Sequence, residues 1–287
     1  MAGPTADEAD SAIPKEAGDS TVDLSSEEQR KVSDRTMPRP QVVYEVIRQE
    51  GEIELSRPTA ALAWSGLAAG LSMGFSLVAQ GTLVAMLPAA PWRPLISSLG
   101  YSIGFIIVIL GRQQLFTENT ITPILPLLLN FTRARFFNVA RLWTVVLLAN
   151  LAGTFIFALV ATGAKVFPAD VHAAFVSLGT AAAAPAFLTL FVRGVFAGWL
   201  IALMVWVLPN AQQARTMVIL IITYVVGVAG LSHVVAGSID VLAAVLAGNV
   251  TWAHFIGGFL LPVFLGNTVG GVALVAGLNH AQVVPEA

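Results

Sequence analysis

A single histidine lies in the middle of a long apolar segment. His233 stands within residues 217–246, and Gly237 and Ser238 follow it closely. An ionisable side chain inside a membrane span is costly and is by default a functional candidate, and imidazole can exchange protons near neutral pH. His233 is therefore predicted to donate a proton or a hydrogen bond to a molecule passing through the protein. A structural hydrogen bond to a neighbouring helix is the alternative.

A second polar interruption occurs in residues 95–129, where Thr117, Glu118 and Asn119 follow an apolar run. These side chains could form hydrogen bonds with an interrupted backbone or with a permeant. Arg112 and Arg193 are the basic residues that fall inside the predicted spans and away from their ends. Each must face a cavity or pair with an acid such as Glu118 or Asp240.

Other chemistry has little support in the sequence. The chain has no cysteine and only four histidines, without metal-ligand spacing, so no metal and no cofactor is expected. No nucleophile–base pair or phosphate-binding loop is present, so an enzyme is not expected. Because there is no basic patch outside the N-terminal region, nucleic acid is not an expected partner.

The composition indicates a membrane protein. Of the 287 residues, 56% are hydrophobic and only 11% are charged, whereas a soluble domain carries about 25% charged residues. About 20 apolar helical residues cross a bilayer, and six segments reach that length, so we expect an all-α membrane protein with six transmembrane helices. The segments are 60–87, 95–129, 139–166, 187–208, 217–246 and 253–278.

The second and fifth segments are longer than one crossing and contain the two polar interruptions. A helix broken at membrane depth is tolerated where its backbone is buried in protein or lines a cavity. The two breaks are therefore the predicted permeation site.

The second half of the chain repeats a pattern of the first. A G-x-x-x-G spacing recurs in the first and fourth spans, and N-x-x-G recurs in the third and sixth. Three spans followed by three more give an inverted 3+3 repeat, in which the asparagines are expected to cap half-helix ends. These positions are Gly66, Gly70, Gly194, Gly198, Asn150, Gly153, Asn267 and Gly270.

The basic residues of the short loops predict the orientation. They concentrate before the first span, around residues 133–141 and at Arg215, which places both termini in the cytoplasm. Residues 1–36 are predicted to be a disordered acidic tail, 37–57 an amphipathic helix on the membrane surface or the helix bundle, 58–280 the six-span channel domain, and 281–287 a short cytoplasmic C-terminus.

Four segments resemble motifs of the formate/nitrite transporter family. Residues 114–119 resemble its (E/D)LFTGN loop, 193–200 its RGxxxNWLV stretch, 230–233 its histidine-bearing fifth span and 266–271 its GNxxGG motif. The resemblance extends over about residues 40–280. It is closest to a subgroup of bacterial inner-membrane proteins, through residues 104–108, 112–120, 197–202 and 279–282.

The resemblance implies an aquaporin-like protomer, assembled as a homopentamer in a bacterial inner membrane, that passes small monovalent anions, often together with a proton. It implies that His233 is the central histidine and that Thr117 is its hydrogen-bonding partner. By position, the apolar residues of one constriction would be Tyr101, Phe105 and Val226, and those of a second would be Leu115, Phe116 and Ile201.

Several positions depart from the family pattern. Asp170 stands where a vestibule lysine is expected, Gln114 replaces an acid, Glu118 replaces a small residue, and Asp240 has no expected counterpart. An acid at position 170 repels anions rather than attracting them.

We therefore expect a membrane channel or transporter for small monovalent anions or weak acids, with the lipid bilayer and the permeant as its partners. The alternatives are a channel for a small neutral or weakly basic solute, or a non-transporting membrane scaffold. The scaffold would be favoured if Arg112 or Arg193 paired with an acid across the pore.

Overall fold

The structure is a computed structural model that describes residues 24–35, 39–163 and 165–283. Residues Met1–Met37 and Pro38–Ala287 form two separate units. In the first unit, helix α1 (Ser26–Arg35) occupies part of the segment for which disorder is predicted. The reason is local: Ser25 N donates a hydrogen bond to Glu28 Oε2 at 2.9 Å, and Glu28 N donates to Ser25 Oγ at 3.4 Å, as in a capping box. The rest of the predicted tail lies outside the described residues, apart from Leu24 and Ser25.

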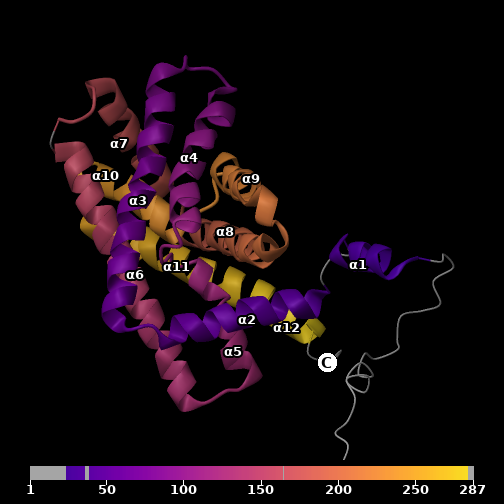
Figure 1. Ribbon diagram of the computed structural model, residues 1–287. Coiled ribbons are helices and arrows are strands. Elements are labelled where there is room, and N and C mark those ends of the chain that lie inside the picture. Colours follow the sequence, from indigo (N-terminus) through magenta and orange to yellow (C-terminus); the bar gives the residue numbers. More distant parts are fainter. Residues whose placement is uncertain (1–23, 36–38, 164, 284–287) are drawn as a thin grey trace, which may run out of the picture. The chain divides into compact units, whose positions relative to one another are not determined.

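The regular secondary structure among the described residues of the second unit is all helical, and short loops join the helices (Figure 1). Its first half contains α2 (Pro40–Ser56), α3 (Thr59–Met86), α4 (Arg93–Leu110), the 3-10 turn η1 (Glu118–Thr120), α5 (Ile124–Leu129) and α6 (Arg133–Gly163). Its second half contains α7 (Ala169–Ala183), α8 (Phe187–Val207), two 3-10 turns, η2 (Leu208–Asn210) and η3 (Gln212–Ala214), α9 (Arg215–Val228), α10 (Val234–Leu246), a π-helical segment η4 (His254–Leu260), α11 (Leu261–Val269), a second π-helical segment η5 (Gly270–Gly277) and α12 (Leu278–Val283).

The predicted all-α membrane fold is confirmed. Five helical runs among the described residues are long and apolar enough to cross a membrane: Thr59–Met86, Arg93–Leu110, Arg133–Gly163, Phe187–Asn210 and His254–Val283. The fifth predicted span is present as α9 and α10, which are each shorter because the chain breaks between them. The second span is likewise divided into α4 and α5.

The two breaks have the same backbone conformation. Gln113 N donates a hydrogen bond to Val108 O at the end of α4, and Leu231 N donates to Val226 O at the end of α9, both at 3.0 Å. The residue before each donor is left-handed, with φ 50° at Arg112 and φ 61° at Gly230. A glycine adopts this conformation without strain, whereas arginine does not.

Two asparagines hold the breaks in equivalent ways. Asn150 Oδ1 accepts a hydrogen bond from Phe116 N, and its Nδ2 donates to the carbonyl oxygens of Gly66 and Gln114. Asn267 repeats this arrangement in the second half: Oδ1 accepts from Val234 N, and Nδ2 donates to the carbonyl oxygens of Gly194 and Ser232. These six bonds measure 2.8–2.9 Å. Each amide therefore satisfies three buried backbone groups that a broken helix leaves open.

The repeat begins earlier than the sequence pattern suggests. A Cβ on Gly51 of α2 would collide with Thr122 O, and a Cβ on Gly179 of α7 would collide with Asp240 O. The surface helix α2 and the unpredicted helix α7 are therefore counterparts, and they lie at opposite ends of the bundle (Figure 1). Each packs through a small residue on the outer half of a broken span, so each repeat is one surface helix followed by three spans.

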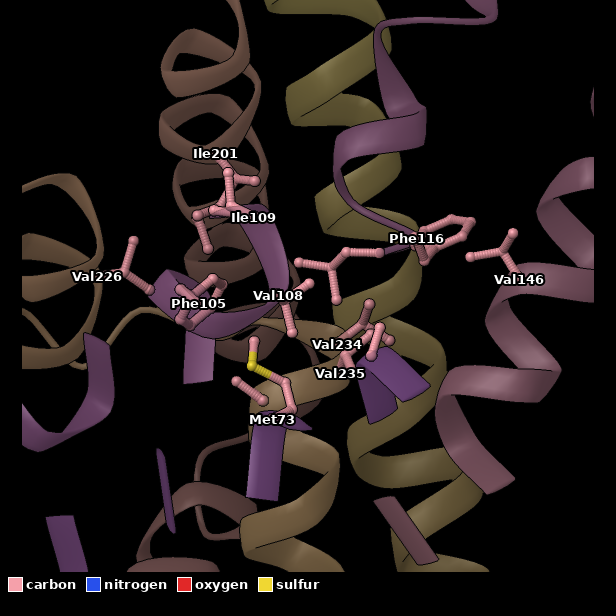
Figure 2. Packing of buried hydrophobic residues seen from close by; sticks show 14 of the residues in the cluster. Met73, Phe105, Val108, Ile109, Phe116, Val146, Ile201, Val226, Val234 and Val235 are labelled. Atoms are coloured by element: carbon pink, nitrogen blue, oxygen red, sulfur yellow. The ribbon is translucent and has the colours of Figure 1, made fainter. Parts of the chain in front are cut away.

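The core lies where the two halves meet. Phe105 and Val108 on α4, Ile201 on α8 and Val226 on α9 are completely buried and belong to one apolar cluster (Figure 2). The face of α2 that carries Val43, Tyr44, Ile47 and Leu55 joins the same cluster. Because this face is buried, α2 lies against the bundle, which is one of the two locations predicted for the amphipathic segment.

Candidate permeation site

The two helix breaks bring one polar pair together at the centre of the protein. Thr117 Oγ1 lies 2.7 Å from His233 Nε2. Thr117 is completely buried and His233 is 1% exposed. The pair joins the first break to the second, so the residues predicted to act together do lie in contact.

The other nitrogen of His233 caps α10. Nδ1 accepts hydrogen bonds from Val235 N at 3.2 Å and Ala236 N at 3.1 Å. Because Nδ1 faces two N–H donors, the proton of the neutral ring is on Nε2. Nε2 therefore donates to Thr117 Oγ1, and the Thr117 hydroxyl keeps its own proton for another acceptor.

Aromatic rings cover one side of the histidine. Phe105 meets the imidazole edge-on, with the two ring centroids 4.9 Å apart. Tyr101 lies one helical turn before Phe105 in α4, and the centroids of these two rings are 5.3 Å apart. Both rings come from the same face of α4 because they are four residues apart.

The other predicted constriction residues are also buried. Leu115, Phe116, Ile201 and Val226 have no exposed surface. The ring of Phe116 contacts Trp143 and Phe264, and Figure 2 shows it beside Val146. Its visible contacts are therefore with α6 and the last span, and its place in a constriction stays a prediction.

A cavity of about 260 Å³ opens at the α2 end of the bundle. We call it the α2-end cavity. Three polar residues singled out in the sequence, Arg112, Glu118 and Asn119, line this cavity. Glu50 and Glu54 from α2 and Arg215 from α9 also line it. The lining residues are Val46, Glu50, Glu54, Ile109, Arg112, Gln113, Gln114, Glu118, Asn119, Thr122, Val205, Leu208, Pro209, Gln212 and Arg215.

A hydrogen-bond network fixes one wall of this cavity. Gln114 Nε2 donates to Glu54 Oε2 at 2.7 Å, and Gln114 Oε1 accepts from Asn119 Nδ2 at 2.9 Å. Arg57 forms an ion pair with Glu54 at 3.0 Å, and Trp143 Nε1 donates to Asn119 O. Asn119 thus forms hydrogen bonds with other protein groups through both its side chain and its carbonyl oxygen.

Arg112 lines the α2-end cavity, which is one of the two alternatives expected for it, and its ion-pair partner is a different acid from the two suggested. Its guanidinium pairs with Glu50 Oε1 at 3.6 Å, rather than with Glu118 or Asp240, and both side chains are well exposed. The left-handed backbone at Arg112 directs the residue towards the cavity rim. The pair therefore does not block the buried centre, which removes one argument for a non-transporting scaffold.

Asp170 and Asp240 both belong to the α7 end. Asp170 is exposed in the first turn of α7, where its carboxylate accepts a hydrogen bond from Val171 N. It does not line the second cavity at this end, of about 390 Å³, which lies around Thr180, Thr251 and His254. Asp240 lies on α10, half-buried, within electrostatic reach of Tyr101.

Sequence reasoning missed Glu50 and Glu54 because they belong to an amphipathic helix for which no role in the site was predicted. Their spacing was a usable signal, since Val46, Glu50 and Glu54 recur every four residues and so share one face of a helix. The capping role of His233 had no sequence signal beyond its position after a predicted break.

A family model described as formate/nitrite transporter matches residues 41–281. The chain belongs to the formate/nitrite transporter family. It is therefore a multi-pass membrane channel or transporter protein and not an enzyme.

Curated relatives agree with this family membership. The chain is 41% identical to the inner membrane protein YfdC of Escherichia coli K12, over 91% of this chain and 86% of that protein. It is 27% identical to the nitrite transporter NirC of the same organism, over 78% of this chain and 83% of that protein.

Two solved structures share the fold of this family member. A pentameric formate channel with formate bound has a TM-score of 0.67 at 21% identity, over 83% of this chain and 99% of the other. An FNT family ion channel has a TM-score of 0.69 at 23% identity, over 84% of this chain and 98% of the other.

Proposed function

We propose that the protein is a homopentameric channel or proton-coupled carrier of a bacterial inner membrane, which passes small monovalent weak acids such as formate or nitrite. The observation that carries this proposal is the buried Thr117–His233 pair, at 2.7 Å, at the junction of the two helix breaks. A hydroxyl with a free proton and an imidazole fixed in one tautomer suit a small oxyanion or its acid.

The surroundings of the pair favour a neutral passing species. Phe105, Leu115, Ile201 and Val226 are apolar and completely buried. Moving a bare anion into such surroundings costs far more than moving the corresponding neutral acid. Transport together with a proton removes most of that cost.

The comparisons support the permeant class and the assembly. The solved formate channel is described as pentameric with formate bound, and NirC is described as a nitrite transporter. For orientation, Arg133, Arg135 and Arg141 near the α2 end favour a cytoplasmic location of that end, and the relative YfdC is described as an inner membrane protein.

The direct test is uptake of formate and nitrite into proteoliposomes, with and without an inward proton gradient. We expect uptake that the gradient stimulates, and slower uptake with and without the gradient in His233→Asn, which removes the hydrogen-bond donor of the central pair. His172→Asn, which removes a histidine on α7 away from the breaks, is the matched control and should behave as wild type.

Uptake at the rate of empty liposomes, by protein shown to be pentameric, would overturn the proposed permeant class. A small neutral or weakly basic solute would then be the stronger candidate, because Glu118, Asp170 and Asp240 are all acids.

A further inference from the structure

Glu118 is a half-buried acid that has no bonded partner among the described residues. It lines the α2-end cavity directly after Thr117. Among the described residues, its carboxylate forms no hydrogen bond and no ion pair within 4.0 Å, although Glu50, Glu54, Arg112 and Arg215 lie within electrostatic reach. An unpaired carboxyl at such a depth is a functional candidate.

Asp240 is the corresponding acid on the other side of the central pair. It too is half-buried, and within the described part of the chain it forms no hydrogen bond or ion pair. His233 is the N-cap of α10, and Asp240 follows it by seven residues, about 10 Å along the helix. Asp240 therefore lies about two turns nearer the α7 end than the Thr117–His233 pair.

The repeat gives an independent placement of Asp240. Its counterpart in the first half is Thr122, because the carbonyl oxygens of these two residues meet Gly179 and Gly51 in the same way. Thr122 lines the α2-end cavity. Asp240 therefore occupies the equivalent position in the second half of the repeat, towards the α7 end, outside the cavity around Thr180 and His254.

The two ends of the protein differ sharply in the number of ionisable residues at these positions. Five ionisable residues of the α2-end cavity have non-ionisable counterparts at the α7 end. Glu50 and Glu54 correspond to Leu178 and Ala182, Arg112 to Gly230, Glu118 to Ala236 and Arg215 to Ser97. Among the counterparts of the residues that line the α2-end cavity, Asp240 is ionisable where the cavity residue, Thr122, is not.

We propose that Asp240 and Glu118 are the proton-exchanging residues of the two mouths, Asp240 at the α7 end and Glu118 at the α2 end, on either side of the Thr117–His233 pair. This inference rests on the proposed function. The permeant reaches each mouth as an anion and crosses the apolar centre as a neutral acid.

The proton transfer balances at each mouth. At the α7 end, the O–H bond of the Asp240 carboxyl breaks and an O–H bond forms on the oxyanion, which leaves Asp240 as a carboxylate that takes a new proton from water on that side. At the α2 end, the neutral acid gives its proton to the Glu118 carboxylate and leaves as an anion. Glu118 then returns that proton to water on its own side.

The charged and titratable neighbours of the two acids are different. Glu118 faces Glu50 and Glu54 of α2, Arg112 of the break and Arg215 of α9. Within the described residues, the titratable group in electrostatic reach of Asp240 is Tyr101 of α4. The two mouths should therefore respond to the pH of their own compartments independently.

The test measures formate uptake by oriented protein. The chain has no cysteine, so Gln212→Cys in the α2-end cavity allows a membrane-impermeant thiol reagent to block every protein whose α2 end faces outward. Uptake then reports only entry through the α7 mouth. Asp240→Asn and Glu118→Gln are compared with the carboxyl-retaining Asp240→Glu and Glu118→Asp, and with Glu27→Gln in α1 as control.

We expect Asp240→Asn to reduce uptake at least about 100-fold at external pH 7, the lower end of the range for a positioned proton donor. At external pH 5 the deficit should shrink, because neutral acid is then supplied by the solution. Asp240→Glu should restore uptake. Formate uptake by Glu118→Gln should no longer depend on internal pH, and it should still depend on external pH.

Three results would overturn the inference. A rise in uptake by Asp240→Asn at pH 7 means that the acid only repels anions, and an equal loss at every pH means that its role is structural. In both cases uptake by the wild type keeps the proposed function intact. No uptake by the wild type rejects the proposed function and this inference with it.

Discussion

The imidazole of His233 is engaged at both nitrogens. Nδ1 accepts the amide protons of Val235 and Ala236, and Nε2 donates to Thr117. The ring is therefore both a helix cap and the central polar group. Substitutions at Thr117 separate these two roles because they alter only the Nε2 side.

Thr117→Val should leave the Nε2 proton of His233 without an acceptor. A buried donor in that state costs about 1–3 kcal/mol, so we expect a lower midpoint of thermal unfolding and slower formate uptake. Thr117→Ser keeps the hydroxyl and should remain close to wild type. Nitrogen NMR of labelled histidine checks the tautomer: a protonated Nδ1 in the wild type would contradict the bonding described here.

At the scale of elements, the structure is organised by the two broken spans. Their ends match in backbone conformation, and each is held by an asparagine from the span that ends its half of the repeat. The match extends to the glycines, since Gly70 and Gly198 each lie against the backbone of the corresponding asparagine. Equivalent substitutions in the two halves should therefore have equivalent effects.

Asn150→Leu and Asn267→Leu should each prevent stable assembly. Each removes three hydrogen bonds to buried backbone groups, and each unsatisfied group costs about 1–3 kcal/mol. Size-exclusion chromatography in detergent should show aggregated or dissociated protein for both variants. Asn130→Ala, at an exposed position, is the control. A monodisperse, active Asn267→Leu protein would show that the second break is held by other contacts.

The two left-handed residues at the breaks, Arg112 and Gly230, should respond differently to substitution. Gly230→Ala forces an L-residue into the left-handed region and should destabilise the protein by about 1 kcal/mol. Arg112→Gly relieves that strain but loses the exposed ion pair with Glu50, so its net effect on stability should be small. Chemical unfolding of the two variants measures the difference, and a large destabilisation by Arg112→Gly would contradict this account.

The helix α2 carries a pH-sensitive ion pair outside the membrane spans. Hydrogen bonds from Arg48 and Gln49 lower the pKa of Glu45 to about 2. Because this pKa is depressed, the stabilisation is present above pH 4.5 and is lost as the pH falls towards 2. Glu45 is 46% exposed, so the effect should be below about 1 kcal/mol. Amide hydrogen exchange of α2 in wild type and Glu45→Gln should differ at pH 5 and converge near pH 2.

At the scale of the whole molecule, the permeation site belongs entirely to the second unit. The central pair, both acids of the mouths and the α2-end cavity all lie within Pro38–Ala287. The first unit contributes none of these groups.

Deletion of residues 1–37 should therefore leave assembly and uptake unchanged. Native mass spectrometry and formate uptake of the shortened chain check this expectation. Loss of the pentamer would mean that the N-terminal region takes part in assembly, and a changed rate with an intact pentamer would mean that it regulates transport.

The sequence by itself determined the apolar spans, the two breaks and the inverted repeat. Each of these depends on patterns that are local or that recur along the chain: the length of an apolar run, polar residues within it, and repeated glycines and asparagines. The family motifs at residues 114–119 and 266–271 added the function class to these patterns.

Only the tertiary structure decided the partner of Arg112, the capping of α10 by His233, and the equivalence of α2 and α7. It also decided that Glu118 and Asp240 lie on either side of the central pair. These features depend on which backbone groups come within about 3 Å after the two halves interlock. No periodicity along one segment specifies a distance between two segments, so they become visible only when the helices are packed.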